Sequence, residues 1–106
     1  MYSANELKDP GFSLHHRLIA GDLTASAEIA ELYLPIVTDR LVRIFPHVDD
    51  AHLLDTAVED AILNYIEKPS QYNTEKLKLE SYMVMSAKWD LINLLALQKT
   101  DSLVNL

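Results

Sequence analysis

The stretch of sequence that decides the fold is DAHLLDTAVEDAILNYI, residues 50–66. Its apolar residues recur every three or four positions, which is the spacing of one face of an α-helix. They are Leu53, Leu54, Ala57, Val58, Ala61, Ile62, Tyr65 and Ile66. Asp50 precedes them, as a helix-capping aspartate does, and Pro69 follows them, where a proline ends a helix. This stretch therefore predicts a capped helix that packs one face on a core.

The same period continues on both sides of this stretch. A short helix is expected from Phe12, ending at Gly21. A longer pattern follows it as far as Phe45, and Pro35 inside that pattern either kinks one helix or separates two. The longest pattern covers residues 77–99. Short connections make successive helices pack as antiparallel neighbours.

The predicted fold class is therefore all-α, a compact helical bundle of four to five helices. The length of 106 residues indicates one domain. We expect this domain to cover residues 12–99, with a flexible lead-in at 1–11 and a tail at 100–106. The hydrophobic fraction of 49% is ordinary for a globular domain of this kind.

Composition excludes several classes of function. The chain has no cysteine, which excludes disulfide scaffolds, thiolate zinc sites and cysteine nucleophiles. Its two glycines are too few for a P-loop motif or a dinucleotide-binding fingerprint. No apolar run is long enough to span a membrane, and no secretory signal opens the chain. We expect a cytoplasmic binding module without a cofactor, a metal or a membrane partner, and not an enzyme.

Acidic residues gather beside the apolar stripe of residues 50–66. The formal net charge is −7, and Asp55, Glu59 and Asp60 contribute to it. Asp55 and Glu59 are four residues apart, so their carboxylates lie together on a helix. Three interpretations are open: an acid/base pair, a solvated face, and a docking surface for a basic partner helix.

Two groups of histidines are candidate ligands. Residues 47–52 read HVDDAH, which contains oxygen and nitrogen donors for a divalent metal. Capping by Asp50 is the simpler interpretation of that loop. His15 and His16 are adjacent and point about 100° apart on a helix, so they do not readily share a metal. We expect them at the surface or the edge of the core.

An aromatic and cationic group lies on the last predicted helix. Tyr82, Lys88 and Trp89 are its members. An aromatic ring beside a cation can stack on an unpaired base and neutralise a phosphate. The structural alternative is that Tyr82 belongs to the core and Trp89 is half-buried.

Four motifs, taken in order, resemble region 2 of sigma-70-type transcription initiation factors, in particular the extracytoplasmic-function group. The first is Gly21-Asp22, followed by a small-residue helix start, Leu-Tyr and a proline. The second is DTAVEDAIL at residues 55–63, similar to the family's Asp-Leu-Val-Gln-Glu-x-Phe-Leu. The third is YNTEK at 72–76, and the fourth is the SYM…AK segment at 81–88. The resemblance covers roughly residues 12–99.

The resemblance implies a function in transcription initiation. Asp55 and Glu59 would bind RNA polymerase core by docking on the basic clamp helices of its β′ subunit. Lys88 and Trp89 would be the DNA-binding residues, facing the minus-ten element of promoter DNA. An anti-sigma factor is a further partner that the family implies.

The chain also departs from the family pattern. Val58 stands where the family has glutamine, and Asn93 replaces an acidic residue. The basic run of the last helix is reduced to Lys88 and Lys99, although phosphate contacts provide much of DNA affinity. A second hypothesis is therefore a sigma-like protein-interaction domain that has lost DNA binding. Its partner, a downstream domain or a second copy could pack on the apolar residues Leu91, Leu94, Leu95, Leu97, Leu103, Val104 and Leu106.

Overall fold

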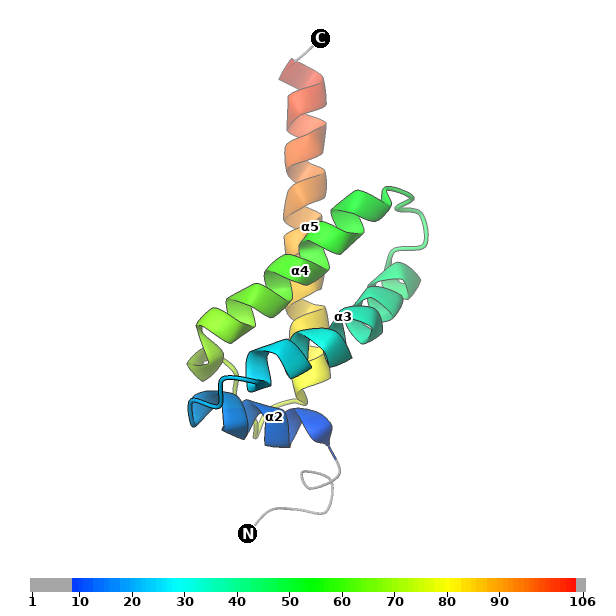
Figure 1. Cartoon of the computed structure of the whole chain (residues 1–106). Helices are drawn as coiled ribbons and strands as arrows, with labels where there is room; N and C mark the ends of the chain where they lie inside the picture. The colour runs from blue at the N-terminus through cyan, green and yellow to red at the C-terminus, as the bar shows by residue number, and fades with distance from the viewer. Residues whose placement is uncertain (1–8, 105–106) are drawn as a thin grey trace.

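The computed structural model of the chain describes the backbone of residues 9–104 and the side chains up to Lys99. All regular secondary structure in this part is helical, which confirms the predicted all-α bundle (Figure 1). In chain order its elements are α2 (Pro10–Ile19), α3 (Ala25–Ile44), α4 (Ala51–Glu67), the short 3₁₀ helix η1 (Pro69–Gln71) and α5 (Leu79–Val104). Residues 1–8 of the expected lead-in and residues 105–106 of the expected tail lie outside the described residues.

Local capping sets the first helix and the start of α4. The Asp9 carboxylate accepts a hydrogen bond from the Gly11 amide at 3.0 Å, so α2 begins at Pro10, two residues before the expected start. Gly21 follows α2 with φ of 87°, a backbone conformation that glycine adopts without strain. The Asp50 carboxylate accepts hydrogen bonds from the His52 and Leu53 amides, as the sequence predicted.

Pro35 lies inside α3 and does not divide it. A proline removes one backbone donor, and packing along the rest of the helix compensates for that loss. Ile29, Tyr33, Val37 and Leu41 are buried at a regular spacing of four residues on both sides of the proline. The alternative of two separate helices is therefore wrong, because one continuous face packs on the core.

The last helix is longer than the sequence pattern indicated. It begins at Leu79 and continues to Val104, whereas the pattern ended at Lys99. No glycine or proline interrupts these residues, so helix propagation continues beyond the packed part. Figure 1 shows α5 running past α4, away from α2. The radius of gyration is 15.5 Å. A compact chain of this length would have a radius of gyration of about 13 Å, so the projecting α5 makes the molecule longer than a compact bundle.

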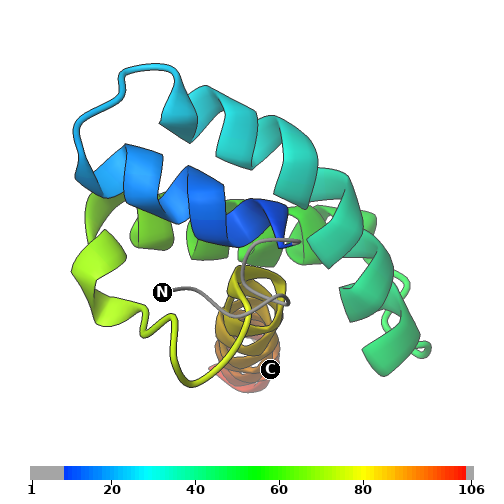
Figure 2. The same cartoon turned by 90° about the horizontal axis from the view of Figure 1, so that it is seen from below.

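The core lies where α3, α4 and α5 meet, with α2 packed across one end (Figure 2). The α5 residues that are completely buried in it are Leu79, Met83, Ala87 and Leu91. Gly11 allows the close approach of α2, because a Cβ there would lie 2.8 Å from the Leu79 Cβ and against the Tyr33 hydroxyl. This packing leaves one long side of α4 open to solvent.

Candidate functional site

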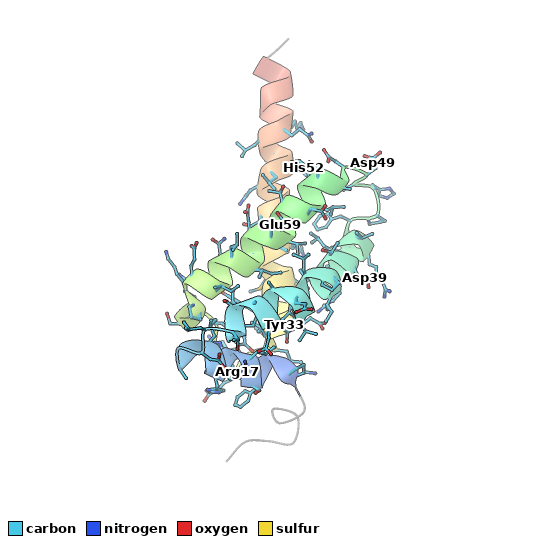
Figure 3. All side chains as sticks on the ribbon, viewed as in Figure 1. Arg17, Tyr33, Asp39, Asp49, His52 and Glu59 are labelled. Atoms are coloured by element: carbon cyan, nitrogen blue, oxygen red, sulfur yellow. The ribbon has the colours of Figure 1, made fainter. Side chains whose placement is uncertain are left out.

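Helical geometry separates the residues of α4 into a buried side and an open side. Leu54, Val58 and Tyr65 are buried, whereas Asp55 and Glu59 are exposed. Glu59 lies midway along the helix (Figure 3). Positions 55, 59, 62 and 66 follow one another at alternating four- and three-residue spacings, so they form one stripe along the helix. The carboxylates of Asp55 and Glu59 therefore share one side of α4, as the sequence predicted.

Asp60 is exposed, as are Asp55 and Glu59, so all three acidic residues expected on this helix reach solvent. Burial, and secondly the charge of Asp60, raise the pKa of the Asp90 carboxyl on α5. The buried Oδ2 of Asp90 has no hydrogen-bond partner among the described residues. A carboxylate deprived of hydrogen bonds is disfavoured in its charged form, which agrees with the raised pKa.

Every arginine of the chain is already engaged in an ion pair. Arg17 binds Asp22 at 2.8 Å and also Glu28, Arg40 binds Glu80 at 2.9 Å, and Arg43 binds Asp39 at 3.2 Å. None of these pairs includes Asp55 or Glu59. Within residues 9–99, these two carboxylates have no cationic partner. They are available to a cation from another molecule.

An apolar groove lies beside these carboxylates, between α3 and α4. Its volume is about 220 Å³. It is lined by Ala30 and Leu34 of α3 and by Glu59, Ile62, Leu63 and Ile66 of α4. Leu34 is 41% exposed and Leu63 is 54% exposed, so both walls present apolar surface to solvent. Glu59 is the one ionisable side chain in this lining, which does not provide the second group that an acid/base pair needs.

Val58 lies on the buried side of α4. The resemblance sets Val58 at a position where the family has glutamine. Its side chain is completely buried in the core. It cannot contact a partner, and valine at this position therefore removes nothing from the exposed surface. A glutamine there would need a buried hydrogen-bond partner.

The candidate DNA-binding residues lie on the solvent side of α5. Lys88 is exposed and Trp89 is 59% exposed. Met85, one turn earlier, is also exposed. Tyr82 is half-buried and packs against the core, where its ring lies 5.2 Å from the ring of Tyr72. Tyr82 is therefore a packing residue, and Lys88 and Trp89 remain accessible.

The two adjacent histidines differ completely in environment. His16 is exposed, whereas His15 is only 3% exposed. The His15 Nδ1 lies 2.6 Å from the Tyr65 hydroxyl, in a hydrogen bond that joins α2 to α4. Burial, and secondly the proximity of His16, lower the pKa of His15. The sequence predicted both histidines at the surface or the edge of the core, which holds for His16 but is wrong for His15. Local sequence carries no signal for the hydrogen bond to Tyr65, because the two residues are 50 positions apart.

The loop before α4 is a helix cap. Asp50 uses its carboxylate for the amides of α4, and Asp49 and His52 lie at the end of the bundle opposite Arg17 (Figure 3). Among the residues described, no group of three or more histidine and acidic side chains comes together as metal ligands would. The two hydrogen bonds to the Asp50 carboxylate confirm the capping interpretation of residues 47–52.

The leucines of α5 are only partly available to a partner. Leu91 is completely buried, and Leu94 and Leu95 are partly buried against the core. Leu97 is 61% exposed. Leu103, Val104 and Leu106, which the sequence added to this surface, lie outside the described side chains.

Comparison with known proteins gave no match to a family model, to a curated protein or to a solved structure. In the described part of the chain, no helix is long and apolar enough to cross a membrane.

Proposed function

We propose that the chain is a transcription initiation factor domain that binds RNA polymerase core through Asp55 and Glu59. The partner surface would be the basic clamp helices of the β′ subunit. The observation that carries this proposal is a pair of exposed carboxylates, one helical turn apart, without a cationic partner in residues 9–99. The sequence motifs between Gly21 and Lys88 point to the same partner.

Electrostatics favours a basic protein at this surface. A net charge of −7 attracts a cationic partner at long range, and the two carboxylates would orient it at contact. The arginines cannot neutralise this surface, because each already pairs with another carboxylate of the chain. The like charges of Asp55 and Glu59 cost some helix stability, and a cationic partner would remove that cost.

Calorimetric titration of the whole chain with a β′ clamp-helix fragment tests the proposal. We expect micromolar binding by the native chain and no measurable binding by the variant Asp55→Lys/Glu59→Lys. The matched control is Glu67→Lys/Glu75→Lys, which makes the same change in net charge at two other exposed positions. Equal losses in both double variants would indicate a general charge effect and would contradict docking at α4. Absence of binding by the native chain would overturn the proposal directly.

Binding of the promoter minus-ten element by Lys88 and Trp89 is a second candidate function. The specific observation in its favour is the exposure of Trp89 beside an exposed lysine on α5. An exposed indole can stack on an unpaired base. The small number of cations on α5 supports the alternative, a sigma-like protein-interaction domain that has lost DNA binding.

Tryptophan fluorescence distinguishes these alternatives, because Trp89 is the single tryptophan of the chain. Titration with a single-stranded oligonucleotide of minus-ten sequence should quench the emission if the base stacks on Trp89. Lys88→Ala should weaken that binding and make it less sensitive to salt. Unchanged emission at low salt would favour the protein-interaction alternative.

A further inference from the structure

The groove between α3 and α4 offers apolar surface to a partner, in addition to the charges of Asp55 and Glu59. Its lining residues other than Glu59 are all apolar, and they come from two helices. Ile62 is buried and forms part of the floor, while Leu34 and Leu63 are exposed on opposite helices. Single exposed leucines are ordinary on a protein surface, but two that border one groove form a binding feature.

The position of the charges indicates what enters the groove. Glu59 lines the groove, and Asp55 lies one turn earlier along the same side of α4. One turn is about 5.4 Å along a helix, which is also the separation of side chains at i and i+4 of a partner helix. An amphipathic helix that lies along this side can therefore present cations to Asp55 and Glu59 together with an apolar side chain to the groove.

We propose that this groove takes one large aliphatic side chain from a basic amphipathic helix, with a lysine or arginine of that helix one turn away on Glu59. This inference rests on the proposed docking function and adds its anchor. The aliphatic anchor slows dissociation, because it fills apolar surface without leaving a charge unpaired. The carboxylates set the orientation and the rate of association.

This division of roles gives the two groups of residues different kinetic signatures. Neutral variants at Asp55 and Glu59 should slow association and reduce its salt dependence. A variant that fills the groove should accelerate dissociation, by about tenfold if the anchor contributes about 1.4 kcal/mol. The groove-filling variant is Ala30→Leu, because Ala30 is half-buried in the lining and carries no charge. Ala96→Leu adds the same group at an exposed position of α5, which contributes no residue to the lining, and serves as its control.

The experiment measures binding kinetics of the whole chain on two immobilised probes. One probe is the β′ clamp-helix fragment. The other is a synthetic lysine-rich helix with a leucine at its centre, compared with the same peptide carrying alanine there. Circular dichroism of Ala30→Leu confirms its fold, and Leu63→Ala, an exposed position of the groove wall, provides a second variant that only removes contact area.

Faster dissociation of the clamp fragment from Ala30→Leu and Leu63→Ala, but not from Ala96→Leu, would support the anchor. Binding that is lost in Asp55→Lys/Glu59→Lys but unchanged in Ala30→Leu would overturn the anchor and leave the docking function intact. Binding of the synthetic helix that depends on its leucine and on Ala30, without binding of the clamp fragment, would support the anchor and overturn the polymerase assignment. No binding of either probe would overturn both.

Discussion

The polar groups at the α2 end of the bundle have partners within the described part of the chain, whereas the carboxylates on the open side of α4 do not. At the α2 end, Arg17 binds Asp22 and Glu28, and hydrogen bonds from Arg17 and Thr24 hold the pKa of Asp22 at about 2. His15 is hydrogen-bonded to Tyr65 inside the core. On α4, Asp55 and Glu59 face solvent beside exposed leucines, with no cationic partner among residues 9–99.

The difference separates residues that stabilise the fold from residues that are free to bind. At the α2 end, the hydrogen bond between His15 and Tyr65 joins two helices that are distant in sequence, so substitutions there should change the free energy of unfolding. The open side of α4 makes few such contacts, so substitutions there should change binding and leave stability almost unchanged.

The largest effect is expected at Val58, next to Glu59 on the opposite side of α4. Val58→Gln buries an amide in the core and should lower the free energy of unfolding by about 2–5 kcal/mol. Glu59→Gln introduces the same side chain one position later, on the exposed side, and should change stability by less than about 0.5 kcal/mol. Urea unfolding followed by circular dichroism measures both. Similar values for the two variants would contradict the assignment of the two sides of α4.

Gly11 tests the close packing of α2. Gly11→Ala places a methyl group against the Tyr33 hydroxyl and the Leu79 Cβ, and should lower the free energy of unfolding by about 1–3 kcal/mol. Adding Tyr33→Phe removes one of these two contacts and should recover part of the loss. Ser13→Ala, at an exposed position of the same helix, is the control. Thermal unfolding gives the stability of the native chain and of the three variants. Unchanged stability in Gly11→Ala would show that α2 packs less closely.

His15 should make stability depend on pH. Because its pKa is lowered in the folded chain, the unfolded chain binds more protons below about pH 6.5, and the free energy of unfolding falls as pH decreases from 7 to 5. His15→Phe leaves the Tyr65 hydroxyl unpaired, which should cost about 1–2 kcal/mol at pH 7, and should flatten this dependence.

The control for His15→Phe is His47→Gln, at an exposed position before α4, which should retain the native pH profile. The range of pH 5–7 also avoids Asp22, whose contribution is lost only as pH falls from about 4 towards its folded pKa of about 2. A difference in stability between the native chain and His15→Phe that stays constant from pH 7 to 5 would rule out a buried neutral His15.

The smallest effect is expected at Asp55. Asp55→Asn removes the like-charge neighbour of Glu59 and should raise the free energy of unfolding by about 0.2–0.5 kcal/mol at low salt. The gain should disappear at high salt, where the repulsion is screened. Glu67→Gln, which has no acidic neighbour four residues away, is the control. A loss of stability in Asp55→Asn would mean that this carboxylate has a cationic partner in the folded chain.

Much of the helical framework is predictable from short stretches of sequence. The apolar period of residues 50–66, the Asp50 cap and the turn at Gly21 all appear as predicted, because each depends on contacts within a few residues. The exposure of Asp55 and Glu59 follows from the same period. The length of α5 was underestimated because its last turns extend beyond the packed core, where no apolar period is required.

Other features of the surface could not be predicted from local sequence. The charge of Asp60 contributes to the raised pKa of Asp90 because α4 packs on α5. The buried position of His15 depends on Tyr65, which belongs to another helix. Both outcomes depend on which helices meet, and the period of one helix does not contain that information.

The sequence by itself determined the helical framework, the aspartate cap of α4 and the side of α4 that carries Asp55 and Glu59, because backbone hydrogen bonding and apolar spacing act over a few residues. The tertiary structure alone decided that Ala30 and Leu34 lie across a groove from Leu63 and Ile66. It also decided that Arg40 of α3 pairs with Glu80 of α5. The reason is that helix packing brings together side chains about 30 residues apart, and their match depends on the crossing of whole helices.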